Sequence, residues 1–281
     1  MSLEDKVNDL NKDEMKLIEK VKKKGLTVKE FDYYLTQIDK SKIEPRNYTI
    51  GKTNVKFGVI SDTHIGSKYY DSNLMTFAAK QFSKEKVDFV IHTGDIIEGM
   101  YPSRGGQLYE LSEIGIDAQI EKAVKELKKI EQPIYFITGN HDYTSKRLAG
   151  MVVGTRIEDK VPNSKFLGED YGRITLKNDV TIDLVHPGDG SSYAISYKSQ
   201  KRIDSLEGGE KPNLMFIGHY HKAEYIFYRN IHAFQSATLE SQTPFMKSKG
   251  LAANKGFYII NLKTKKGQVD RITPTFYPAY N

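Results

Sequence analysis

Five short apolar runs along this chain each end in a group of histidine, aspartate or asparagine residues. The runs are rich in β-branched and aromatic residues, as buried strands are, and span Val55–Ile60, Val87–His92, Pro133–Thr138, Val180–Val185 and Asn213–Ile217. The polar groups that follow them are Asp62-Thr63-His64, Gly94-Asp95, Gly139-Asn140-His141-Asp142, His186 and Gly218-His219-Tyr220-His221. Five of the chain's seven histidines lie in these groups, so the pattern indicates one shared site rather than scattered side chains.

The segments between these runs predict an α/β fold in which strands pack between helices. Apolar residues recur at helical intervals over 72–84, 116–130 and about 193–206, whereas the part from about 224 to 275 is expected to form mostly strands. In open α/β sheets, binding sites assemble at the carboxyl ends of the strands. We therefore expect the five polar groups to converge on one place.

The N-terminal segment differs from the rest, because it is highly charged and has helical spacing. The pairs Asn11/Glu14 and Thr27/Glu30 have the spacing of capping boxes, which predicts short helices joined tightly, as in a helix-turn-helix. We expect a small helical domain over 1–50 and a second domain over 51–281. The helical domain could bind DNA or RNA through its lysines, or it could serve docking, dimerisation or stability.

The composition restricts which metals and which compartments suit the chain. It has no cysteine, so any metal must be held by His, Asp, Glu or Asn, and disulfides are excluded. A net charge of +6 is compatible with a polyanionic partner such as DNA or RNA, and equally with an ordinary basic protein. The start has no signal-peptide pattern, and no apolar run approaches the roughly 18 residues of a membrane span. We expect a cytoplasmic protein without membrane contact.

The polar groups supply oxygen and imidazole ligands for two adjacent divalent ions. The candidate ligands are Asp62, His64, Asp95, Asn140, His186, His219 and His221. Asp62 and His64 are two residues apart and can face one ion, and Asp95 can bridge two ions with its two oxygens. Such ligands suit manganese, with iron, zinc and nickel as alternatives. Two ions about 3.5–4 Å apart clamp a displacement at phosphorus.

These motifs, in this order, resemble the calcineurin-like metallophosphoesterases over residues 55 to about 265. The resemblance implies a four-layer α-β-β-α sandwich with a dinuclear site. It implies a first ion on Asp62, His64, Asp95 and His221, and a second ion on Asp95, Asn140, His186 and His219. It also implies that His141 is the general acid that protonates the leaving oxygen, with Asp142 orienting its imidazole.

Two departures from the family pattern narrow the expected activity. Members that act as Ser/Thr protein phosphatases carry Gly-Asp-x-x-Asp-Arg-Gly and Gly-Asn-His-Glu, whereas this chain has Gly94-Asp95-Ile96-Ile97-Glu98-Gly99-Met100 and Asp142. The pattern is more similar to the phosphodiesterase and nuclease branch. We therefore expect a metal-dependent hydrolase of phosphodiester bonds, with nucleic acid as a candidate substrate. The alternatives are a phosphodiesterase or phosphatase on small nucleotides, and a DNA-binding regulatory or accessory protein with this fold.

Candidate substrate contacts lie in two segments next to the motifs. Arg104 falls in the long polar segment Gly99–Gly115, where it could pair with a phosphate. Tyr143 and Arg147 follow His141 and could contact a polyanion backbone. Each of these three side chains could equally be a solvated surface residue.

Overall fold

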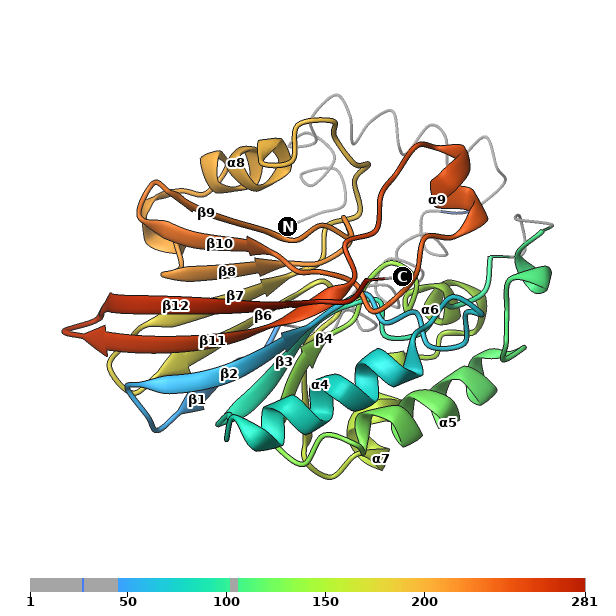
Figure 1. Ribbon diagram of the computed structural model, residues 1–281, viewed down its shortest axis with the longest axis horizontal. Coiled ribbons are helices and arrows are strands. Elements are labelled where there is room, and N and C mark those ends of the chain that lie inside the picture. Colours follow the sequence, from blue (N-terminus) through green and yellow to red (C-terminus); the bar gives the residue numbers. More distant parts are fainter. Residues whose placement is uncertain (1–26, 28–44, 102–105, 281) are drawn as a thin grey trace. The chain divides into compact units, whose positions relative to one another are not determined.

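The computed structural model describes Thr27, residues 45–101 and residues 106–280. From Pro45 onward the chain forms one compact unit with two six-stranded sheets that lie face to face (Figure 1). Sheet A contains, in spatial order, β1 (Asn47–Ile50), β6 (Tyr171–Leu176), β7 (Thr181–Val185), β8 (Leu214–Ile217), β10 (Ile231–Gln235) and β9 (Glu224–Tyr228). Sheet B contains β12 (Gln268–Pro278), β11 (Gly256–Lys265), β2 (Val55–Ile60), β3 (Phe89–Thr93), β4 (Ile134–Ile137) and β5 (Ser164–Gly168).

Helices cover the outer face of each sheet. On sheet B lie α4 (Ser72–Lys84), α5 (Ile116–Leu127) and α7 (Val153–Lys160), and on sheet A lies α8 (Tyr197–Asp204) (Figure 1). The expected four-layer α-β-β-α sandwich is confirmed for the described residues. Shorter elements are α6 (Thr144–Ala149), α9 (Pro244–Ser248), and the 3-10 turns η1 (Gln107–Tyr109) and η2 (Gly208–Glu210).

Aromatic side chains fill the space between the two sheets. The Phe57 ring of sheet B stacks on Phe89 at a centroid distance of 5.0 Å and meets Phe216 of sheet A edge-on at 5.6 Å. All three side chains are buried, which is where aromatic rings contribute most to stability. On the outer face of sheet B, a Cβ at Gly58 would lie 2.4 Å from the Phe82 ring, so glycine lets α4 pack closely on β2.

Parallel pairing places five strand ends at the same end of the sandwich. β2, β3 and β4 pair in parallel within sheet B, and β7 and β8 pair in parallel within sheet A. These are the five strands that the apolar runs predict, and their bounds differ from the predicted ones by at most two residues. The convergence therefore joins two sheets, with three strand ends from sheet B and two from sheet A.

Several elements differ from the sequence-based expectation. β5 and β6 were not predicted, and α9 lies in a segment that was expected to be mostly strands. α5 ends at Leu127 rather than 130, and α8 is shorter than the predicted range 193–206. In the described residues, no helix is both long and apolar enough to cross a membrane.

The expected N-terminal module falls mainly on residues 1–26 and 28–44, which lie outside the described residues. Its last positions include β1, which pairs in parallel with β6 at the edge of sheet A. The division of the chain at residue 50 and the helix-turn-helix over residues 1–50 stay predictions.

Candidate metal centre

The loops after the five strands turn sharply where the candidate ligands stand. Five of these seven residues have a positive φ: Asp62 (47°), His64 (47°), Asp95 (52°), His219 (80°) and His221 (53°). Non-glycine residues adopt this left-handed conformation infrequently, and each instance costs about 1–3 kcal/mol. Backbone strain of this kind gathers at functional sites, where the surrounding fold holds it in place.

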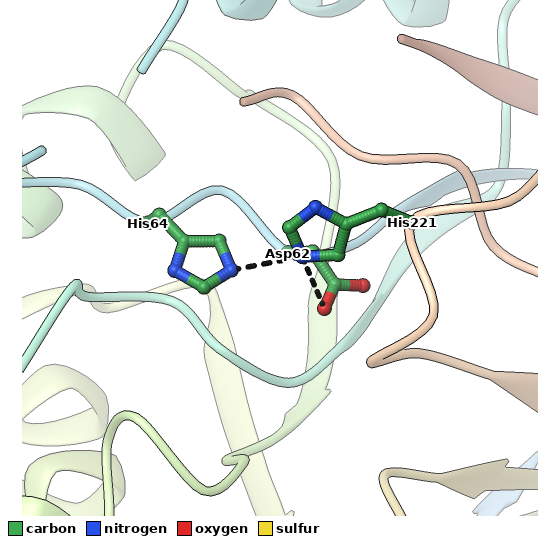
Figure 2. Close-up of side chains that lie close together, drawn as sticks. All are labelled: Asp62, His64 and His221. Atoms are coloured by element: carbon green, nitrogen blue, oxygen red, sulfur yellow. Dashed lines mark hydrogen bonds and ion pairs between the residues drawn. The ribbon is translucent and has the colours of Figure 1, made fainter. Parts of the chain in front are cut away.

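A first group of side chains combines Asp62 and His64 from sheet B with His221 from sheet A (Figure 2). The Nε2 atoms of His64 and His221 lie 3.1 Å apart, and His221 Nε2 lies 3.4 Å from Asp62 Oδ1. His64 Nδ1 donates a hydrogen bond to Glu98 Oε2 at 2.9 Å, which leaves the lone pair of its Nε2 facing the group. Asp62, His64 and His221 therefore each turn a potential ligand atom toward the same point.

A second group combines Asp95 and Asn140 from sheet B with His186 and His219 from sheet A. His186 Nε2 lies 3.1 Å from both Asp95 Oδ2 and Asn140 Oδ1, and His219 Nδ1 lies 2.9 Å from Asn140 Oδ1. His186 Nδ1 donates to the carbonyl oxygen of Thr93 at 2.8 Å, which fixes the orientation of the imidazole. The structure thus gathers the other ligand candidates in a second cluster.

Asp95 lies between the two groups. Its Oδ2 is 3.1 Å from His186 Nε2 and 3.9 Å from His64 Nε2, while its Oδ1 accepts a hydrogen bond from the backbone N of His141 at 2.8 Å. A Cβ at Gly139 would lie 2.4 Å from Asp95 Oδ1, so this glycine is needed for the loop to approach the carboxylate. Asp95 therefore lies where a carboxylate could bridge two ions.

The donor atoms fit divalent cations. Burial acts to raise the pKa of Asp62, but the hydrogen bond and positive charge of His221 lower it to about 2, so this carboxylate is ionised at neutral pH. Burial also acts to raise the pKa of Asp95, but the charges of His186, His141 and His64 together with the hydrogen bond from His186 outweigh it and hold the pKa well below 3.8. Buried carboxylates among imidazoles, with no cysteine, form an oxygen and nitrogen set that binds manganese, iron or zinc. The role of these residues as ligands stays a prediction.

His141 lies beside both groups and is held by Glu98. Its Nδ1 donates to the backbone carbonyl of Glu98 at 2.7 Å and lies 3.5 Å from the Glu98 carboxylate. This leaves Nε2 available to the cleft that His141 lines. Burial acts to lower the pKa of His141, but the charges of Asp95 and Glu98 outweigh it and raise the pKa well above 6.5. A protonated imidazole is what a general acid requires.

The hydrogen bonds of the Asp142 carboxylate go to backbone amides, and its expected role in orienting His141 stays a prediction. The Asp142 carboxylate accepts hydrogen bonds from the backbone N–H groups of Ile96, Ile97 and Gly139 at 2.8–3.0 Å. Its oxygens therefore hold two ligand-bearing loops together, and Glu98 contacts the His141 imidazole.

Two glutamates at the site were missed from the sequence. Glu98 follows the bridging Asp95 by three residues in the same loop, and Glu240 follows β10, which runs parallel to β8. Each could have been found as an acidic residue just beyond a strand end. Both are buried, at 6% and 2% exposure.

A cleft of about 460 Å³ opens above the two groups. Its lining combines the polar side chains of the site with apolar ones that include Phe245, Met246 and Leu251. Tyr101 also lines the cleft, and its hydroxyl donates to the backbone carbonyl of Asn140 at 3.3 Å.

The candidate substrate contacts do not gather in this cleft. Tyr143 and Arg147 are absent from its lining among the described residues, and the Arg147 guanidinium lies 5.1 Å from the Tyr143 ring centre instead. Arg104 lies outside the described residues. Contacts of these side chains with a substrate stay predictions.

Comparisons with known proteins agree with this geometry. Residues 55–223 match the model of the calcineurin-like phosphoesterase family. The chain is 23% identical over 246 residues to the DNA polymerase II small subunit of Thermoplasma acidophilum, covering 75% of this chain and 48% of that protein. It is 26% identical over 238 residues to the protein of the same name in Methanothermobacter thermautotrophicus, covering 67% and 48%. The chain thus spans about half the length of the curated relatives it matches.

Solved structures with a similar arrangement include an archaeal phosphodiesterase, with a TM-score of 0.47 and 17% identity, covering 79% of this chain and 99% of that one. A dimetal phosphatase from Danio rerio has a TM-score of 0.45 and 12% identity, covering 79% and 95%. The family model covers more than half of the chain and includes all the residues of the two groups. The chain belongs to the calcineurin-like phosphoesterase family.

Proposed function

We propose that this protein is a dinuclear-metal-dependent phosphodiesterase that acts on nucleic acid. The observation that carries the proposal is that the seven candidate ligand side chains lie in two adjacent groups, with Asp95 placed between the second group and His64 of the first. Manganese is the proposed ion, because carboxylate and amide oxygens make up much of the set; iron, zinc and nickel are the alternatives.

Two bound divalent ions would neutralise the charge of a phosphodiester and lower the pKa of a water molecule. The chain's own residues supply the remaining chemistry. His141 holds a proton on Nε2 for the leaving oxygen, because the charges of Asp95 and Glu98 raise its pKa. Glu98 orients His64 and His141 by accepting from Nδ1 of each ring, through its carboxylate and its carbonyl respectively.

Nucleic acid is proposed as the substrate on two grounds. The chain carries a net charge of +6, and its curated relatives are named as DNA polymerase subunits. We further propose that the predicted helical module over residues 1–50 contacts DNA or RNA and that the protein acts in the cytoplasm. Cleavage of nucleic acid should then weaken as salt rises, since phosphate contacts release counterions.

A second candidate is an accessory or regulatory subunit that binds DNA without hydrolysing it. The names of the relatives favour this role. The intact ligand set favours the enzyme, because a subunit without catalysis has no need for seven converging ligands and a protonated His141. A phosphodiesterase or phosphatase on small nucleotides is the third candidate, and a substrate panel separates it from a nuclease.

The test is hydrolysis of bis(p-nitrophenyl) phosphate by the full chain with manganese. We expect turnover that falls by at least about 100-fold in Asp95→Ala and in His141→Ala, because general acid catalysis alone contributes roughly 10²–10⁴-fold. His232→Ala is the matched control, since His232 lies on β10 outside the site and is bonded to Tyr225. Absence of turnover with manganese, iron, zinc and nickel would exclude the enzyme. Cleavage of cyclic mononucleotides without cleavage of DNA or RNA would exclude the nuclease.

A further inference from the structure

Glu240 brings a further carboxylate close to His64 of the first group. The segment after β10 is fixed against Asp62: Thr238 Oγ1 and the Leu239 backbone N both donate to the Asp62 carbonyl oxygen, at 2.7 and 3.4 Å. Glu240 itself forms an isolated antiparallel bridge with Tyr70. The backbone therefore holds the Glu240 side chain at a defined position next to a candidate ligand.

The Glu240 carboxylate is turned toward the same atom that faces Asp95. Its Oε2 lies 3.9 Å from His64 Nε2, and Asp95 Oδ2 lies at the same distance of 3.9 Å from that atom. This separation is too long for a hydrogen bond. Two ligand atoms that each lie about 2.1 Å from one ion can be up to about 4.2 Å apart, so the spacing fits two ligands of a shared cation.

A buried carboxylate at Glu240 would also be stabilised by a bound cation. The side chain is only 3% exposed, and its Oε1 accepts a hydrogen bond from Ser67 Oγ at 2.8 Å. Within the described part of the chain, Oε2 has no hydrogen-bond donor; its neighbours in the cleft are the Glu98 carboxylate and the His64 imidazole, whose Nε2 lies 3.9 Å away. Burying a carboxylate without a paired charge costs several kcal/mol.

We propose that Glu240 is a fifth ligand of the first ion, beside Asp62, His64, Asp95 and His221, and that it takes no part in the second site. The inference rests on the proposed two-ion site. It gives the first ion three carboxylates and two imidazoles, a set richer in oxygen than the family pattern alone provides. Oxygen ligands favour manganese over zinc, so Glu240 also sets metal preference.

The test measures manganese binding to the metal-free full chain by electron paramagnetic resonance of the free ion, independently of activity. Wild type should bind two ions. In Glu240→Gln, one of the two dissociation constants should rise at least about 10-fold while the other stays unchanged, because even residues that only orient ligands change affinity by about 10–100-fold. Zinc affinity at that site should fall less than manganese affinity. Glu110→Gln, a carboxylate of the same cleft, is the matched control and should leave both constants unchanged.

Thermal unfolding separates a ligand from a structural residue. With chelator present, Glu240→Gln should be as stable as wild type or more stable, since the variant removes a buried carboxylate that lies next to the Glu98 carboxylate. With manganese, the variant should melt below wild type. An equal loss of stability in both conditions, or two unchanged dissociation constants, would overturn the role of Glu240. If wild type itself binds fewer than two ions, the proposed two-ion site fails instead.

Discussion

The Glu98 carboxylate lies next to two imidazoles, that of His64, a candidate metal ligand, and that of His141, the proposed general acid. Its Oε2 accepts from His64 Nδ1 at 2.9 Å and lies 3.5 Å from His141 Nδ1. Gln107 Nε2 donates to the other oxygen at 3.2 Å, which fixes the carboxylate in turn. Glu98 thus couples the orientation of a metal ligand to the protonation of the proposed acid.

Replacing Glu98 by glutamine should therefore move the pH dependence as well as the rate. A general acid is active while protonated, and the charge of Glu98 helps to raise the pKa of His141. Without that charge the pKa falls, so the alkaline limb of the kcat profile should shift to lower pH, and kcat should drop about 10–100-fold. Glu110→Gln should leave the limb in place. If Glu98→Gln lowers kcat but leaves the alkaline limb of the pH profile in place, then Glu98 only orients the metal ligand and does not affect the protonation of His141.

At the scale of elements, hydrogen bonds to Glu126 of α5 hold the N-terminal end of α4 in place. Its carboxylate accepts hydrogen bonds from Tyr70 Oη at 2.6 Å, Ser72 Oγ at 3.0 Å and Lys129 Nζ at 2.7 Å. Burial acts to raise the pKa of Glu126, and the hydrogen bonds from Lys129 and Tyr70 lower it below the ordinary 4.5. Because the folded pKa is lowered, this stabilisation is present above pH 4.5 and is lost as the pH falls through the lowered value.

Glu126→Gln should accordingly destabilise the protein by about 1.5–3 kcal/mol at pH 7, the range of hydrogen bonds to a charged group. The difference from wild type should shrink below pH 4.5, where the wild-type carboxylate takes up its proton. Urea unfolding at a series of pH values measures it. Glu121→Gln, on the same helix and paired at the surface with Lys160, should show a smaller effect at every pH. A pH-independent difference for Glu126→Gln would contradict the assignment.

Strands could be predicted from the sequence where their residues are all apolar. Strand β8, Leu-Met-Phe-Ile at Leu214–Ile217, is a continuous apolar run and lies within one residue of its predicted bounds, whereas β6 reads Tyr-Gly-Arg-Ile-Thr-Leu, in which polar residues and a glycine alternate with apolar ones. Histidines are rare in the chain, so their grouping revealed the site; glutamates are common, so Glu240 could have been singled out only by its position beyond a strand end. Asp142 neighbours His141 in sequence, but its carboxylate turns to backbone amides, which spacing alone cannot foretell.

For the whole molecule, metal binding should govern thermal stability. Both candidate sites pre-exist in the fold, with buried carboxylates and a strained backbone held by the two sheets. A ligand that binds only the folded state at 100 times its dissociation constant adds about 2.7 kcal/mol, which corresponds to a rise in Tm of several degrees at this size. Calorimetry with manganese and with chelator measures the shift. Identical melting curves in the two conditions would show that the chain takes up no ion.

Each candidate ion would draw ligands from both sheets: Asp62 and His64 from sheet B with His221 from sheet A, and Asp95 and Asn140 from sheet B with His186 and His219 from sheet A. In a chain that has no cysteine, the two ions would therefore act as covalent cross-links do in a secreted protein, tying the layers of the sandwich together at one end. The opposite end, at the turn of the β11–β12 hairpin, carries none of the candidate ligands, so unfolding of the loaded protein should begin there.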